Sequence, residues 1–275
     1  MTKVNWMDGG ILFELNKIND DFGEKLVEYN KEIIYKLYEE YINIGAKFIT
    51  TNNYGFKPSR SNNWKELTYN TKDIFKKIKI KYPNVSILGC IPPFHSSYYD
   101  GEITENFLDF YRELIPILNE YVDMFIIETN ISYNHCYHIC DVISNLNINK
   151  SIIISIYPDN ITKSQLSQLI KIHNIISIMI NCCSFDKMNK YYNKEIKYLL
   201  ENYNNINFGF YLNKINEQSY KYDQNKKELQ NYKHNICDLE KIKKFIQNYN
   251  KKEIYIGGCC GYGINEMKEL INYME

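Results

Sequence analysis

The segment Met124-Phe125-Ile126-Ile127-Glu128-Thr129 decides the fold, because an uninterrupted apolar run ends on a carboxylate. Successive side chains of a strand point to opposite faces of a sheet, so an unbroken apolar run predicts a strand that is buried on both sides. Ile152-Ile153-Ile154 repeats this pattern further along the chain. Strands of this kind are typical of parallel sheets covered by helices. We therefore expect an α/β protein with Glu128 at the carboxyl end of a strand.

Strand-like runs recur along the whole chain and alternate with segments of helical periodicity. We expect strands at approximately 4–8, 47–51, 85–91, 122–129, 151–157, 175–181, 206–212 and 253–257. Repeated strand–helix units predict a parallel sheet, and eight of them predict a closed (β/α)8 barrel. The sequence contains no interdomain linker. We therefore predict a single TIM-like barrel domain over residues 1–275.

Apolar residues at three- and four-residue steps mark helices between these strands. The clearest examples lie at 33–44, 107–118, 166–173 and 239–249. Proline lacks the backbone donor that a helix interior needs. We expect Pro116 to kink or weaken the second of these helices.

Composition limits the classes of function. The chain carries 33 basic and 33 acidic residues, so no excess of positive charge indicates nucleic acid as a partner. The first residues lack the apolar core of a signal peptide, and no stretch reaches the ~18 apolar residues of a membrane span. We expect a cytoplasmic protein with reduced thiols. Its eight cysteines then indicate metal binding or catalysis rather than disulfides.

Candidate functional residues fall at or just beyond the carboxyl ends of the expected strands. They are Asp8, Thr51-Asn52, Gly89–Pro93, Glu128, Cys182 and Cys259-Cys260. A barrel brings these strand ends together on one face, where its active sites are built. These residues are therefore predicted to share one site.

Cys182, Cys259 and Cys260 are the predicted metal ligands. Adjacent strand residues point to opposite faces, so Cys259 and Cys260 can reach one ion only where the strand has ended, and the glycines around them permit this. Three thiolates would leave a fourth position open, as in a catalytic zinc site. Buried structural cysteines, or a redox pair at Cys259-Cys260, are the alternatives. Cys183 competes with its neighbour, and Cys182 is preferred because it directly follows Asn181.

Other titratable residues have simpler interpretations. His135, Cys136, His138 and Cys140 share helical faces that can hold a metal, but no glycine-rich turn accompanies them, so we expect an ordinary helix. His95 is expected to be a loop histidine near the site. Carboxylates such as Asp8 and Glu128 are either caps and ion-pair partners or a binding site for a substrate ammonium group.

Taken together, the motifs resemble the zinc-dependent homocysteine S-methyltransferase family almost from end to end. They are Asp8-Gly9-Gly10, Thr51-Asn52-Asn53-Tyr54, Gly89-Cys90-Ile91-Pro92-Pro93 followed by Ser97-Tyr98 and Asp100, Glu128-Thr129, Asn181-Cys182 and Gly257-Gly258-Cys259-Cys260-Gly261. The sequence departs from the family pattern at Met179, where a glycine is usual, and at Tyr262, where a threonine is common.

The resemblance implies a (β/α)8 barrel in which Cys182, Cys259 and Cys260 bind Zn2+. Glu128 and Asp8 would hold the amino-acid end of homocysteine, and Asn181, Gly9 and Gly10 would shape the pocket beside them. The implied reaction needs no catalytic group beyond the zinc-activated substrate thiolate, and its product would be methionine.

The Gly89–Pro93 run resembles the branch of the family that uses sulfonium donors, S-methylmethionine or S-adenosylmethionine. Folate and corrinoid donors normally need further domains, and the sequence ends at Glu275, so a sulfonium donor is expected. The alternatives are betaine as donor, another thiol or a selenol as acceptor, a non-catalytic zinc-binding barrel, and a thiol redox protein. The polar stretch 213–235 is expected to be a surface loop, or a lid over the site.

Overall fold

The computed structural model describes residues 2–18, 24–95, 100–214 and 236–275. Within these ranges, eight parallel strands form one sheet in the order β1-β8-β7-β6-β5-β4-β3-β2. The strands are β1 (Lys3–Trp6), β2 (Phe48–Thr50), β3 (Ser86–Ile91), β4 (Met124–Asn130), β5 (Ile152–Ile156), β6 (Ile175–Cys183), β7 (Asn207–Leu212) and β8 (Glu253–Gly258). Every expected strand is therefore present, in the expected order.

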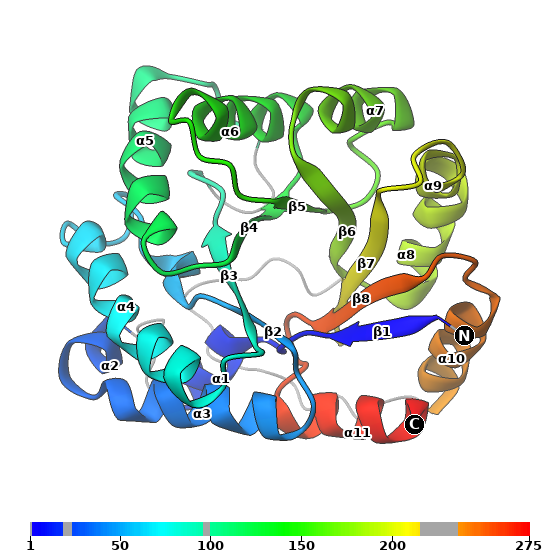
Figure 1. Cartoon of the computed structure of the whole chain (residues 1–275), viewed down its shortest axis with the longest axis horizontal. Coiled ribbons are helices and arrows are strands. Elements are labelled where there is room, and N and C mark those ends of the chain that lie inside the picture. The colour runs from blue at the N-terminus through cyan, green and yellow to red at the C-terminus, as the bar shows by residue number, and fades with distance from the viewer. Residues whose placement is uncertain (1, 19–23, 96–99, 215–235) are drawn as a thin grey trace.

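The sheet curls until its two end strands, β1 and β2, meet. A parallel bridge joins Met7 to Phe48. The Lys47 N–H donates to the Trp6 carbonyl at 2.8 Å, and the Asp8 N–H donates to the Phe48 carbonyl at 3.0 Å. These contacts bring β2 against β1 in a nearly closed barrel, so the predicted TIM-like architecture is confirmed (Figure 1).

Helices surround the barrel on the outside, as Figure 1 shows. Those described are α1 (Ile11–Ile18), α2 (Glu24–Tyr29), α3 (Lys31–Asn43), α4 (Trp64–Lys81), α5 (Glu105–Asn119), α6 (Tyr133–Asn145), α7 (Lys163–Ile172), α8 (Phe185–Tyr191), α9 (Lys197–Asn202), α10 (Ile236–Asn248) and α11 (Ile264–Met274), with short turns η1 (Asn53–Gly55) and η2 (Tyr192–Ile196). None of these helices combines the length and the apolar character that crossing a bilayer requires.

Two apolar clusters explain why the strands read as unbroken apolar runs. The larger cluster fills the space between the outer faces of the strands and the helices, and it includes Ile127, Ile154 and Phe208. The smaller cluster fills the barrel interior. Its members are Met7, Leu88, Ile126, Ile153, Met179, Tyr211 and Tyr255. Each strand thus buries alternate residues on opposite sides.

Two details differ from the sequence-based expectation. The sequence predicts that the sixth strand ends at Asn181, but β6 continues through Cys183, because its pairing with β7 resumes there. Pro116 does not interrupt α5, which runs on to Asn119 and keeps Leu114 and Leu118 buried in the outer layer. Apolar packing of this helix outweighs the loss of one backbone donor.

Candidate active site at the carboxyl ends of the strands

A polar layer lies directly above the apolar interior of the barrel. Residues two apart on a strand share a face, so the residue two positions after each interior residue also faces the inside of the barrel. The interior residues at this level are Leu88, Ile126, Ile153 and Met179. The residues at those next positions are Cys90, Glu128, Ser155 and Asn181. The barrel therefore changes from apolar to polar within one step at its carboxyl-terminal mouth.

Backbone irregularities in β4 and β6 shape this mouth. The pairing register shifts between Ile127 and Asn130 on β4, and between Asn181 and Cys183 on β6. Thr129 and Cys182 take positive φ angles of 53° and 58° at these irregularities, a conformation that non-glycine residues rarely adopt. The Asn181 Nδ2 donates to Thr129 Oγ1 at 2.8 Å, which ties the two irregularities together. Such features re-aim side chains next to active sites.

The three predicted ligand cysteines converge at this mouth. The Sγ atoms of Cys182 and Cys260 are 3.7 Å apart, and those of Cys259 and Cys260 are 3.9 Å apart. All three sulfurs lie within 4.8 Å of one another. Among the described residues, these three side chains form the cluster that could hold a metal ion. The choice of Cys182 over Cys183 agrees with this geometry, because Cys183 packs in the outer apolar cluster.

The sulfur positions fit a tetrahedral metal ion. Sulfurs that bind one zinc at about 2.3 Å lie about 3.8 Å from each other. The observed separations of 3.7 and 3.9 Å match this value. Three sulfur donors leave a fourth position for another ligand. The cluster can therefore hold a metal ion with an open coordination site.

Without a cation, these thiols oppose each other's ionisation. Hydrogen bonds with Cys182 and Cys260, together with burial, raise the pKa of the Cys259 thiol well above its ordinary range. A thiolate trio is stable only when a positive ion balances its charge. The Asn213 Nδ2 adds one donor 3.5 Å from the Cys182 sulfur.

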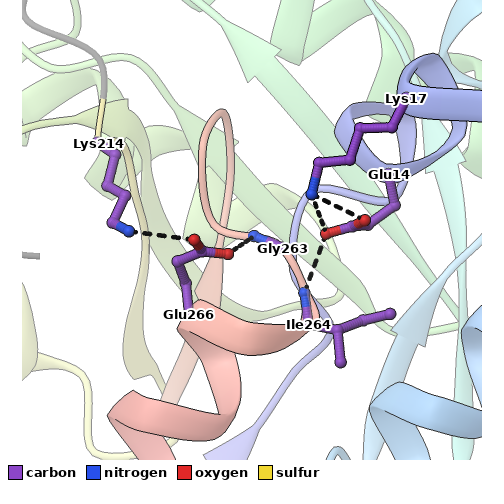
Figure 2. A network of polar contacts seen from close by, with 6 residues as sticks. All are labelled: Glu14, Lys17, Lys214, Gly263, Ile264 and Glu266. Carbon is purple, nitrogen blue, oxygen red and sulfur yellow. Dashed lines mark hydrogen bonds and ion pairs between the residues drawn. The ribbon is translucent and has the colours of Figure 1, made fainter. Parts of the chain in front are cut away.

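A network of polar contacts holds the loop that carries Cys259 and Cys260 (Figure 2). Glu266 caps the start of α11 by accepting from the Gly263 N–H at 3.0 Å, and it pairs with Lys214 Nζ at 3.2 Å. Glu14, from α1, accepts from the Ile264 N–H at 3.1 Å. The Lys214 N–H donates in turn to the Cys260 carbonyl at 3.1 Å. These contacts join the segment after β7 to the start of α11 at the cysteine loop.

Gly9 and Gly10 pack against the same loop. A Cβ atom on Gly9 would lie 2.3 Å from the Tyr262 carbonyl oxygen, and one on Gly10 would lie 2.6 Å from the Cys259 carbonyl oxygen. No side chain fits at such distances, so both positions require glycine. The Gly10 N–H also donates to the Tyr262 carbonyl at 2.8 Å. These residues thus bring the segment after β1 close to the cysteines.

Two carboxylates face this mouth, Glu128 from β4 and Asp8 from the segment that follows β1. Burial raises the pKa of Glu128 to about 7 and that of Asp8 well above its usual range. The charge of Glu128 raises the pKa of Asp8 further. Asp8 accepts from the Thr50 N–H at 2.7 Å, and Glu128 lies 3.1 Å from the Cys90 sulfur. A bound cation would favour the ionised form of both groups.

Several buried polar atoms that have no partner among the described residues lie at the same end of the barrel. In the described part of the chain they include Asn181 Oδ1, Ser155 Oγ and both amide atoms of Asn52. Asn181 and Ser155 belong to the polar layer, and Asn52 lies just beyond the carboxyl end of β2. Buried polar groups in proteins nearly always have partners. Their concentration here indicates a ligand-binding site.

The helical His/Cys set stays outside this site, as expected. Cys136 and Cys140 are fully buried in the outer apolar cluster. The His135 Nε2 lies 2.7 Å from the Gly101 carbonyl, and His95 Nε2 lies 3.3 Å from the Glu102 carbonyl. Of the expected loop or lid at 213–235, only Asn213 and Lys214 fall within the described residues, and Ser97-Tyr98 fall outside them.

Cys90 lies in the Gly89–Pro93 motif and Asn213 begins the expected loop, but the sequence predicted no role for either side chain in the site. Each lies two residues beyond an interior residue, Leu88 and Tyr211 respectively. That spacing is visible in the sequence, but only the register of neighbouring strands shows which side chains they meet. Cys90 meets Glu128, and Asn213 meets Cys182.

Comparison with known proteins places this geometry in context. The family model for homocysteine S-methyltransferase matches residues 6–274. The chain belongs to the homocysteine S-methyltransferase family. It is thus a member of a family of methyltransferases, whose substrates are small molecules. No curated protein matches this chain by sequence.

Solved structures support the fold. The homocysteine methyltransferase MmuM from Escherichia coli, in its metallated form, superposes with a TM-score of 0.75 at 16% identity, over 98% of this chain and 96% of that chain. Its oxidized form gives 0.75 at 16% identity, over 97% and 94%. A type I 3-dehydroquinate dehydratase from Clostridium difficile gives 0.54 at 11% identity, over 98% and 91%. At these identities the likeness concerns the barrel alone.

Proposed function

We propose that this family member is a zinc-dependent enzyme that transfers a methyl group from a sulfonium donor to the thiol of L-homocysteine, giving methionine. Residues 1–275 would form one homocysteine-binding barrel domain. The observation that carries the proposal is the convergence of the Cys182, Cys259 and Cys260 sulfurs beside two carboxylates. Sulfur donors favour zinc over magnesium or calcium, which prefer oxygen.

The metal would supply the chemistry that a free thiol lacks. A thiol has a pKa of about 8.5, so at neutral pH only a few per cent is the nucleophilic thiolate. Zinc bound by the three cysteines would hold the homocysteine sulfur as a thiolate at its open position. The remaining tasks fall to the protein, which must bind the amino-acid end and align the two reactants.

The amino-acid end of homocysteine carries an ammonium group, which needs acceptors. Asp8 and Glu128 supply carboxylates, and Asn181 supplies a buried Oδ1 that has no partner among the described residues. An ammonium group placed among them would lower the pKa of both carboxyls, which burial now raises. Gly9 and Gly10 would contribute by letting the cysteine loop approach this pocket.

Methyl transfer from a sulfonium requires no proton movement at carbon. The thiolate electron pair forms a new bond to the methyl carbon, and the old carbon–sulfur bond breaks onto the donor sulfur. The donor thereby becomes a neutral thioether. The Gly89–Pro93 segment supports S-methylmethionine or S-adenosylmethionine as this donor, through its resemblance to the sulfonium-using branch.

The test combines metal analysis with product formation. The purified protein should contain one zinc per chain and form methionine from homocysteine with S-methylmethionine or S-adenosylmethionine. Betaine, and selenocysteine as acceptor, belong in the same panel. Methionine formation that persists after complete removal of the metal would overturn the proposal.

A spectroscopic arm separates the enzyme from a non-catalytic metal-binding barrel. Cobalt in place of zinc reports its ligands through its visible spectrum. Added homocysteine should change that spectrum because its sulfur enters the open position. Cys183→Ala is the matched control, since this neighbouring thiol lies in the outer apolar cluster. It should bind metal and homocysteine as the unsubstituted protein does.

A further inference from the structure

Cys90 is a buried thiol at the barrel mouth that the proposed reaction does not yet use. It lies in β3 next to β4, and its side chain is fully buried. Its sulfur lies 3.1 Å from Glu128 Oε2, within hydrogen-bond distance for a thiol donor. Unlike Cys136, Cys140 and Cys183, it belongs to neither apolar cluster. Its side chain therefore meets a carboxylate rather than an apolar layer.

The backbone of Cys90 is fixed on both sides by the segment after β2. Its N–H donates to Thr51 Oγ1 at 2.8 Å, and its carbonyl accepts from Asn53 Nδ2 at 2.9 Å. The Thr51 hydroxyl donates in turn to Asn53 Oδ1 at 2.6 Å. This closed set of bonds fixes the Cα–Cβ direction of Cys90, from which its thiol reaches Glu128.

The thiol acts as the donor in this contact. Burial and the adjacent Glu128 charge raise the pKa of Cys90 well above its ordinary range, so its proton stays on sulfur. An ionised carboxylate only accepts hydrogen bonds. The S–H of Cys90 therefore donates to Oε2 of Glu128, and because a carboxylate has about four lone-pair positions, Glu128 can still accept from further donors.

A second observation indicates what such a donor is. The side-chain amide of Asn181 also contacts Glu128, and its buried Oδ1 meets no hydrogen-bond partner in the part of the chain that the structure describes. The remaining lone pairs of the Glu128 carboxylate and the Oδ1 of Asn181 are acceptors that match a group offering several N–H donors. An ammonium group has three of them and no acceptor.

We propose that Cys90 is a positioning residue, whose S–H orients Glu128 toward the ammonium group of the bound amino-acid thiol. This inference rests on the proposed function, because it takes Glu128 as the residue that binds homocysteine. It assigns a role to a third kind of cysteine in this chain, neither metal ligand nor apolar filler.

The test uses zinc-loaded protein with Cys90→Ala and Cys90→Ser. Loss of a hydrogen bond to a charged group should raise KM for homocysteine roughly tenfold in the alanine variant, with kcat and KM for the donor within about twofold. Serine keeps a donor at this position and should restore KM to within about threefold of the unsubstituted value. Cys183→Ala, which removes a buried thiol from the outer layer, should leave KM unchanged.

A binding experiment separates this role from a general structural effect. Binding of homocysteine and of 4-mercaptobutanoate, which lacks the ammonium group, is followed by the spectrum of cobalt-substituted protein. Cys90→Ala should weaken binding of homocysteine and leave binding of the desamino thiol unchanged. Equal weakening of both ligands, or no weakening of either, would overturn the inference.

The two hypotheses fail in different ways. If the unsubstituted protein makes no methionine with any donor, the proposed reaction is wrong, while the binding comparison still tests the contact between Cys90 and Glu128. If methionine forms but both Cys90 variants bind homocysteine like the unsubstituted protein, the reaction stands and the role of Cys90 is wrong.

Discussion

Cysteines occupy two contrasting regions of this barrel. Cys136 and Cys140 lie one turn apart on the regular helix α6, in the outer apolar layer. Cys182, Cys259 and Cys260 lie at the mouth, on backbone that has left regular strand geometry. All of them are cysteines outside any disulfide among the described residues, so residue type alone does not distinguish the two regions.

The difference arises from backbone geometry and neighbours. In the outer layer, burial raises the pKa of Cys136 to about 12, and the thiol remains a neutral apolar side chain. At the mouth, a positive φ at Cys182 and the turn after β8 bring three sulfurs within 4.8 Å. Sulfur atoms so close together are stable as thiolates only around a cation. A cysteine becomes a potential ligand here because of where the backbone bends.

The largest expected effect comes from removing one sulfur of the trio. Cys260→Ala leaves two ligands, too few for a tight zinc site, so zinc per chain should fall from about one to near zero. Methionine formation should fall by at least ~1000-fold, because the substrate thiol is no longer activated. Metal analysis of the purified variant and a methionine assay measure both. Cys140→Ala, from the outer layer, should retain its zinc. Loss of zinc from both variants would contradict the conclusion that only the cysteines at the mouth bind metal.

The polar mouth should also make the metal-free protein sensitive to pH. Burial raises the pKa of Glu128 from an ordinary 4.5 to about 7, so the folded protein holds this proton where the unfolded chain has lost it. Stability from this group is therefore fully present below about pH 4.5 and falls as pH rises toward 7. Between pH 5 and 8, the free energy of unfolding should fall by roughly 2 to 3 kcal/mol more than in Glu128→Gln.

Urea titrations of both metal-free proteins at each pH measure this difference. Asp8 has a pKa raised in the same direction, and Glu128→Gln removes the part of that rise that the Glu128 charge causes, so the difference between the two proteins reports Glu128 together with its coupling to Asp8. Equal pH slopes for the two proteins would show that Glu128 is not desolvated at the mouth.

The barrel could be predicted from the sequence because its evidence is local. The apolar runs, helical stripes and glycines around Cys259 each lie within a few residues, and the strands lie where they were expected. The convergence of strand ends then follows from barrel geometry. For this reason, residues as distant along the chain as Cys182 and Cys260 could be assigned to one site from the sequence alone.

The side-chain contacts and backbone irregularities of the site depend on pairing between strands, which no local sequence pattern shows. The contact of Cys90 with Glu128 requires the register of β3 against β4. The positive φ of Cys182 arises where the pairing of β6 with β7 skips one residue. In the sequence, Met179 is only a departure from glycine, yet it belongs to the apolar layer beneath Asn181.

An intermediate effect is expected from a polar change in the outer layer. Cys140→Ser places a hydroxyl where the buried thiol lies among apolar side chains, and burying such a group without a good partner costs about 1 to 3 kcal/mol. Zinc content and kcat should not change. Urea unfolding of the zinc-loaded protein measures the loss. A drop in zinc binding with unchanged stability would mean that the two regions are coupled.

The smallest effect tests how firmly the mouth is held from outside. Glu266→Gln keeps an oxygen that can accept from the Gly263 N–H, but it removes the charge that pairs with Lys214 beside Cys260 (Figure 2). Partly exposed ion pairs contribute about 0.5 kcal/mol, so zinc affinity should fall roughly two- to threefold. Chelator competition measures this change. Glu253→Gln breaks the pair with Lys3 at the opposite end of the barrel and should leave zinc affinity unaltered. If both variants weaken zinc equally, the network acts on general stability, and the cysteine loop is positioned by its own backbone bonds.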